Sequence, residues 1–168
     1  MKRSSLKNLV LSALFLAIGL VLPFFTGQVP AVGKMLLPMH IPVLLCGLIC
    51  GWQYGLGVGF VLPLVRSALF YMPVMFPTAI AMAFELAAYG LVIGLLYAHS
   101  RWQCVKALYK CLIPAMIAGR LVWGVVMVVL MGLSGGAFTL ELFMAGAVVN
   151  ALPGIALQLV LIPAVMVL

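Results

Sequence analysis

Successive apolar stretches with short polar stretches between them occupy most of this chain, and this pattern decides which solvent it can fold in. Hydrophobic residues make up 67% of the 168 residues, charged residues make up 7%, and the mean hydropathy is +1.37. A soluble domain is about 45–50% apolar and about 25% charged. No soluble fold of this length has an interior that could bury so much apolar surface. We therefore expect lipid to surround most of the chain.

The apolar stretches predict an all-α membrane protein, a bundle of six transmembrane helices in one integral membrane domain, residues 1–168. A helix needs roughly 20 apolar residues to cross a bilayer, which leaves no room for a separate soluble domain. The first stretch is long for a signal peptide and has no small-residue cleavage motif after it, so we expect it to be a retained span. The predicted spans cover about residues 6–22, 40–50, 54–70, 78–98, 106–133 and 141–168.

The distribution of basic residues predicts the orientation of these spans. The net charge is +7, from nine Lys and Arg against two acids, and six of the basic residues fall in two groups. One group precedes the first span and the other lies between the fourth and fifth: Lys2, Arg3 and Lys7, then Arg101, Lys106 and Lys110. The positive-inside rule places both groups, and hence both termini, in the cytoplasm. Five or seven spans would require a redrawn boundary, most readily at the short second span. No basic patch with interleaved aromatics indicates a nucleic-acid partner.

Polar side chains inside the apolar stretches are the first candidates for function. A centred Arg or Asp costs about 2.5–3.5 kcal/mol on insertion scales, so such residues are rarely kept without a role. At about 1.5 Å per residue, Arg66, Glu85, Arg120 and Asn150 all fall in the outer half of their spans, whereas Gln158 lies in the inner half. We expect an outward-facing pocket that binds a small polar molecule.

The charges in this predicted pocket allow alternatives. Arg66 and Glu85 would serve equally well as a structural ion pair between neighbouring helices or as part of the ligand site. Arg120 then has no acidic partner, because the second acid, Glu141, begins the last span. An anionic ligand would supply one, since guanidinium groups bind carboxylates and phosphates in bidentate geometry. Alternatively, Arg120 binds loop carbonyl groups.

Aromatic residues and one histidine complete the candidate ligand-binding set. Tyr71, Phe76 and Trp123 lie on the predicted outer side, where they would either cover a ligand or form an interfacial belt. His40 begins the second span, where a lone histidine is more often a cap or loop tether than a metal ligand. No second ligand stands at metal-binding spacing, so we expect no metal and no cofactor.

Small residues in the first span suggest a helix-contact face. Ala13 and Ala17 form an AxxxA step, which permits close approach of another helix. Packing within the chain is the alternative interpretation. The four cysteines are expected to be small apolar packing residues rather than a disulfide framework. No Ser/His/Asp or HExxH arrangement occurs, so we do not expect an enzyme.

Three segments, taken in order with Ala13 and Ala17, resemble the substrate-binding (S) component of an energy-coupling factor (ECF) vitamin transporter. They are LPMHIPVLLCG at 37–47, PLVRS at 63–67 and FPTAIAMAFEL at 76–86. The resemblance implies a prokaryotic cell-membrane protein that binds a vitamin or precursor in an outward pocket gated by the loops 24–38 and 71–77. It also implies a membrane scaffold (T) subunit on the Ala13 and Ala17 face, and two partner ATPases. The chain itself has no phosphate-binding GxxxxGK[ST] loop.

The predicted net positive pocket favours a carboxylate-bearing vitamin, with pantothenate as the first choice. Riboflavin, folate, a pyridoxine-like compound and a cobalamin precursor are the alternatives. Nickel and cobalt members of the family begin Met-His, and Lys2 argues against metal uptake. Two other interpretations are an intramembrane enzyme that uses Glu85 as acid and base, and a non-transporting bundle that only assembles with other membrane proteins.

Overall fold

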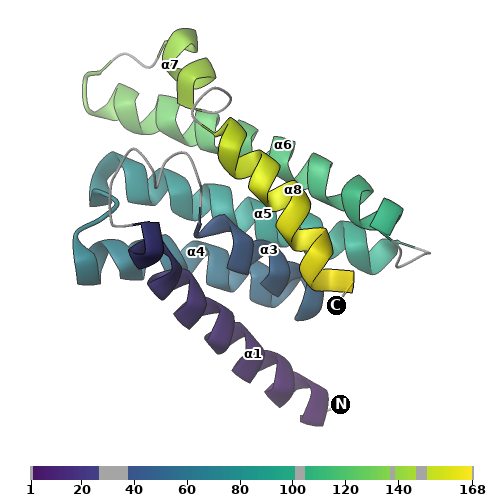
Figure 1. Ribbon diagram of the computed structural model, residues 1–168. Coiled ribbons are helices and arrows are strands. Elements are labelled where there is room, and N and C mark those ends of the chain that lie inside the picture. Colours follow the sequence, from purple (N-terminus) through teal and green to yellow (C-terminus); the bar gives the residue numbers. More distant parts are fainter. Residues whose placement is uncertain (1, 27–37, 101–104, 137–138, 147–150, 168) are drawn as a thin grey trace.

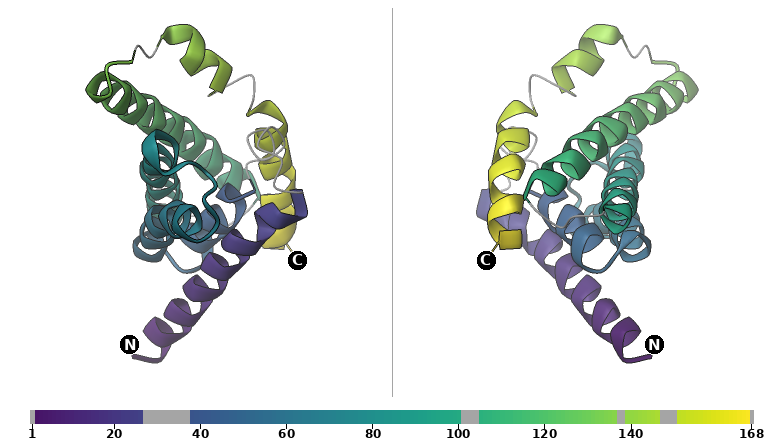
Figure 2. Two further views of the ribbon diagram at one scale, coloured as in Figure 1. Left: turned by 90° about the vertical axis from the view of Figure 1, so that its left-hand side faces the viewer. Right: turned by 90° about the vertical axis from the view of Figure 1, so that its right-hand side faces the viewer.

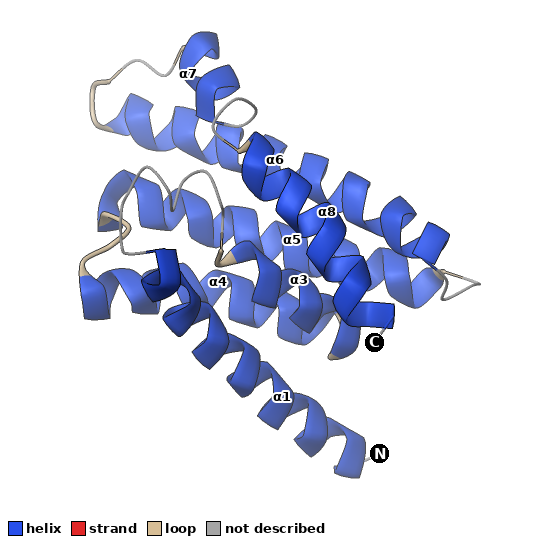
Figure 3. Ribbon diagram, in the orientation of Figure 1, coloured by secondary structure: helices blue, strands red, loops and turns tan. Residues whose placement is uncertain are grey.

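The computed structural model describes residues 2–26, 38–100, 105–136, 139–146 and 151–167, and every regular element in these ranges is helical (Figure 3). The long helices follow the predicted apolar stretches. In chain order the elements are α1 (Lys2–Val21), η1 (Leu22–Thr26), α3 (His40–Ile49), α4 (Trp52–Phe70), η2 (Met75–Ala79), α5 (Ile80–His99), α6 (Val105–Leu133), α7 (Leu140–Met144) and α8 (Leu152–Val167).

Within the described residues, four segments are long and apolar enough to cross a membrane. They are Ser5–Phe25, Trp52–Phe70, Met75–His99 and Val105–Leu133. The helices α3 and α8 are also apolar, but at 10 and 16 residues they are shorter than the roughly 20 residues of a full crossing. Among the described residues, helix length therefore supports four membrane crossings.

In the part of the predicted last span, 141–168, that the structure describes, there are two helices. The first, α7, ends at Met144, and α8 begins at Leu152. Pro153 is the second residue of α8. Proline has no N–H group and a fixed φ, so it is favoured in the first turn of a helix. This proline is the sequence signal for a new helix start.

Helix α5 lies at the centre of the bundle and packs against α3, α4 and α6 (Figure 1). Two adjoining groups of buried apolar side chains fill the space around it. One joins α3, α5, α6 and α8 and includes Leu44, Tyr89 and Leu112, and the other joins α3, α4 and α5 around Leu62 and Leu86. Helix α1 runs along the edge of the bundle (Figure 2).

Glycines bring α4 and α5 into backbone contact. A Cβ atom at Gly59 would collide with the backbone carbonyl of Leu86, and one at Gly90 would collide with the carbonyl of Gly55. Small residues permit this close approach between membrane helices. The tight α4–α5 contact holds α5, and with it Glu85, in a set position relative to the other helices.

Candidate functional site

Three polar side chains from three helices meet at one carboxylate oxygen, and two of them are buried. Glu85 of α5 accepts a hydrogen bond from Arg120 Nη1 of α6, with 2.9 Å between Nη1 and Oε1. His40, the first residue of α3, places Nε2 3.4 Å from the same oxygen. Glu85 and His40 are each 1% exposed. We call these three residues the Glu85 cluster.

The helices position the Glu85 cluster through local spacing and close packing. Tyr89 lies four residues after Glu85 and therefore on the same face of α5. Its ring stands edge-to-face against the His40 ring, with the centroids 5.2 Å apart. On the other side, a Cβ atom at Gly119 would lie 2.9 Å from the Tyr89 ring, so only glycine lets α6 approach this closely. Arg120 is the next residue, and the approach brings its guanidinium to Glu85.

Arg120 uses only one edge of its guanidinium within the described part of the chain. Nη1 binds Glu85, whereas Nε and Nη2 are buried and have no hydrogen-bond partner among the described residues. Nε and Nη2 form the side-on edge of the guanidinium, whose two parallel N–H groups match the two oxygens of a carboxylate. Buried donors without acceptors are costly. The geometry therefore calls for an acceptor group at this edge.

The predicted Arg66–Glu85 ion pair does not form, and the prediction that Arg120 lacks an acidic partner is wrong as well. Arg66 instead donates from Nη1 to the backbone oxygen of Leu20, at 2.6 Å. Its guanidinium lies 5.2 and 5.4 Å from the ring centroids of Phe24 and Phe70. The last four carbonyl groups of a helix have no partner within it and carry the negative end of the helix dipole. Arg66 of α4 thus caps the end of α1.

Of the remaining candidate residues, the structure describes Tyr71, Phe76 and Trp123. Tyr71 ends α4 with a left-handed φ of 56°, and its side chain is 84% exposed. Phe76 is 45% exposed. Trp123 stacks on Phe143 of α7, with the ring centroids 6.1 Å apart. Asn150 lies outside the described residues. Contact of these four residues with a ligand stays a prediction.

Sequence reasoning missed Tyr89 and gave no role to Gln158. Tyr89 carries no charge, so a search for ionisable groups passes over it, although its i+4 spacing from Glu85 was available as a signal. Gln158 of α8 is buried, and neither of its amide atoms has a partner among the described residues. Its burial was not predictable from hydropathy, because a single amide scarcely changes the mean over an apolar helix.

A comparison with protein families decides what kind of protein carries this cluster. The family model "ECF transporter, substrate-specific component" matches residues 7–166. The chain belongs to this family. Comparison with curated proteins and with solved structures gives no match.

The family assignment confirms the resemblance inferred from the sequence. Members are the substrate-binding subunits of membrane transporters and are not enzymes themselves. The long apolar helices agree with a multi-pass membrane protein. The alternative of an intramembrane enzyme is therefore not supported. In this substrate-specific component, Glu85 is instead held between two nitrogen donors.

The exposed face of α1 contains the predicted AxxxA step. Ala13 and Ala17 are both exposed, so the alternative of packing within the chain does not hold for their side chains. A shallow apolar groove adjoins Ala17 and is lined by Ala17, Ile18, Val21, Leu22 and Phe25.

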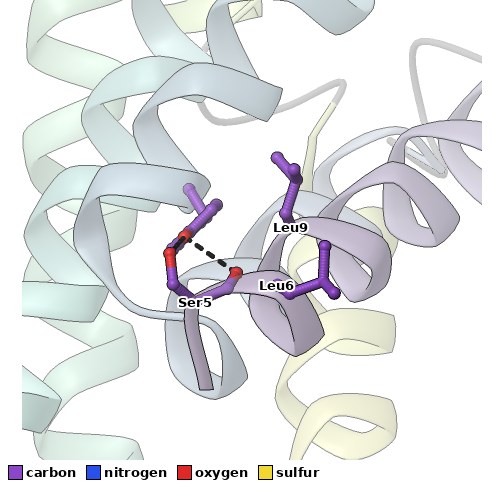
Figure 4. Close-up of a pocket in the computed structure, with 4 residues that line it drawn as sticks. Ser5, Leu6 and Leu9 are labelled. Carbon is purple, nitrogen blue, oxygen red and sulfur yellow. Dashed lines mark hydrogen bonds between the residues drawn. The ribbon is translucent and has the colours of Figure 1, made fainter. Parts of the chain in front are cut away.

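The opposite end of α1 is attached to the bundle by polar contacts. An open cleft there is lined by Ser5, Leu6, Leu9 and Tyr54 (Figure 4). The hydroxyl groups of Ser5 and Tyr54 are 3.3 Å apart. This cleft involves none of the residues of the Glu85 cluster.

Proposed function

We propose that this substrate-specific component binds a small vitamin-like molecule through an anionic group that contacts Arg120. The observation that carries the proposal is that the buried Nε and Nη2 atoms of Arg120 have no hydrogen-bond partner in the part of the chain that the structure describes. A carboxylate at this edge would accept both N–H groups in parallel, which is the strongest neutralising geometry for arginine. Glu85 holds Nη1 and so orients the free edge.

Pantothenate remains our first candidate because it carries one carboxylate. The support for it changes, however, since Arg66 caps α1 and adds no charge contact to the Glu85 cluster. The shape of the Arg120 edge, rather than a net positive pocket, is what favours a carboxylate ligand. Riboflavin, folate, a pyridoxine-like compound and a cobalamin precursor remain the alternatives.

The membrane topology that we propose has six spans, with both termini in the cytoplasm of a prokaryotic cell. It is supported by the two basic groups near the N-terminus and between α5 and α6. In this topology α3 and α8 are short spans. The ligand-binding edge of Arg120 would then lie in the outer half of the membrane.

The partners that we propose are a membrane scaffold subunit and two ATPase subunits. The scaffold subunit would contact α1 along Ala13 and Ala17. Their exposure supports this, because small side chains on an open helix face allow another helix to approach closely. The adjoining apolar groove offers further contact area.

A thermal-shift screen of the detergent-purified chain against water-soluble vitamins and their precursors tests the proposal. A ligand that binds only the folded state adds about 2.7 kcal/mol of stability at 100 times its Kd. We expect one compound, or one group of related compounds, to raise the melting temperature. If no compound on the panel shifts the melting curve, the proposed binding function is wrong.

A further inference from the structure

We propose that His40 balances the charge of the ligand site by taking up a proton when an anionic group binds to Arg120. The inference rests on the proposed function. It adds a role for His40, which we do not propose as a direct contact of the anionic group. His40 acts through Glu85, because both His40 and Arg120 contact the same Oε1 atom.

The resting cluster is electrically neutral when His40 is neutral. Glu85 contributes one negative charge and Arg120 one positive charge, 2.9 Å apart. A carboxylate accepts hydrogen bonds but cannot donate them, so the His40 nitrogen that faces Oε1 carries the hydrogen. The neutral imidazole therefore already donates toward Glu85, and a protonated imidazole would keep the same contact.

An anion at the free edge of Arg120 changes this balance. Two carboxylates would then share one guanidinium in a buried site, leaving one net negative charge. Uncompensated charge in a poorly solvated site is costly. A proton on His40 returns the net charge to zero without moving any of the three side chains.

The groups around His40 favour this assignment. Helix α5 presents Glu85 and Tyr89 to it, and α6 presents Arg120 through Glu85. Helix α8 has no titratable residue. Arg66 of α4 contacts the backbone oxygen of Leu20 in α1 and two phenylalanine rings, and none of its contacts is with His40.

The other titratable residues of the packed elements lie at other positions along their helices. Lys2, Arg3 and Lys7 belong to the first turns of α1. Cys46 lies in the second half of α3, Cys50 follows its end, and Tyr54 lies in the first turn of α4. Tyr97 and His99 are in the last turn of α5, and Lys106, Tyr109, Lys110 and Cys111 are in the first two turns of α6. Lys34, between η1 and α3 in sequence, lies outside the described residues. Histidine is the side chain whose ordinary charge change falls between pH 5 and 8, so His40 is the group suited to this exchange.

The inference predicts that ligand affinity rises as the pH falls. A ligand carboxylate ordinarily titrates near pH 4 and stays ionised above pH 6. Where binding takes up one proton, the Kd decreases by about tenfold for each unit by which the pH is lowered. The decrease is smaller when proton uptake is partial.

The test is isothermal titration calorimetry of the full-length purified chain with pantothenate from pH 6 to pH 8, in buffers with different heats of ionisation. We expect a Kd at least about fivefold lower at pH 6 than at pH 8, with net proton uptake seen as a buffer-dependent heat. Panthenol, which has an alcohol in place of the carboxylate, serves as the matched control ligand and should show neither effect. His40→Gln keeps an N–H donor for Glu85 but cannot take up a proton, so its Kd should vary by less than about twofold.

The outcomes separate this inference from the proposed function. If pantothenate binds with the same Kd at both pH values and no proton uptake, His40 does not balance the charge, and the binding function stands. An unchanged pH dependence in His40→Gln would also overturn the role of His40. If neither pantothenate nor any other compound on the vitamin panel binds at any pH, the proposed function fails, and this inference fails with it.

Discussion

Arg120→Met would leave the Glu85 carboxylate buried without its 2.9 Å ionic partner. The 3.4 Å contact with His40 and the side-chain hydrogen bond with Tyr89 would remain, and the Glu85 side chain is 2% exposed. Removing one member of a buried ion pair costs about 3–5 kcal/mol. Glu85→Gln should cost less, toward the lower end of that range, because the Arg120 side chain is 12% exposed.

The double variant Glu85→Gln/Arg120→Met removes both charges and keeps the side-chain volumes similar. Replacing both members of a buried pair is often neutral or stabilising, so we expect it to unfold within about 1 kcal/mol of the parent. Methionine is unbranched and fills the space of the arginine stem. The double variant should therefore be more stable than Arg120→Met alone.

Unfolding in mixed micelles with increasing sodium dodecyl sulfate measures the four proteins of this cycle. We expect a coupling energy of at least about 2 kcal/mol between the two positions, within the range found for residues in one ionic network. Additive effects, with a double variant as unstable as the sum of the single changes, would refute the ion pair as a contributor to stability.

Four further variants, one of them a control, test other parts of the account. Gly59→Ala should destabilise the protein by about 1–3 kcal/mol through overpacking of α4 on α5. Gly57→Ala, where the Cβ meets open space, should be neutral or stabilising in the same unfolding assay. Arg66→Gln should lower stability by about 1–3 kcal/mol because it removes the cap of α1, and the ligand Kd measured by calorimetry should change by less than about twofold. A loss of ligand affinity would indicate that Arg66 belongs to the ligand site. Ala13→Leu/Ala17→Leu should abolish co-purification with the scaffold subunit while the ligand-induced thermal shift persists; intact assembly would contradict the proposed α1 contact.

The helices could be predicted from the sequence because their signal is local. Long apolar runs and their proline and glycine boundaries indicate each long helix to within a few residues. The exception is the last span, where hydropathy continues across 141–168 although α8 begins within it, at Leu152. An apolar run alone cannot distinguish one helix from two.

The candidate site was predictable as a set of residues but not as a set of contacts. The high cost of polar groups in lipid indicated Glu85 and Arg120. Which arginine pairs with Glu85 depends on the rotation of each helix about its axis and on which helices are neighbours, and hydropathy contains neither. Arg66 faces the carbonyl end of α1, 46 residues away in sequence, and no local pattern links these two positions.

The central claim is that the free edge of Arg120 binds the ligand, and calorimetry on the Glu85→Gln/Arg120→Met double variant tests it most directly. This variant keeps the fold in our account and lacks only the charged pair. We predict that the compound identified by the thermal-shift screen binds the parent protein and binds the folded double variant at least about 100-fold more weakly, since a hydrogen bond to a charged group contributes about 1.5–3 kcal/mol and two are lost. Binding to the double variant with the Kd of the parent would contradict the claim.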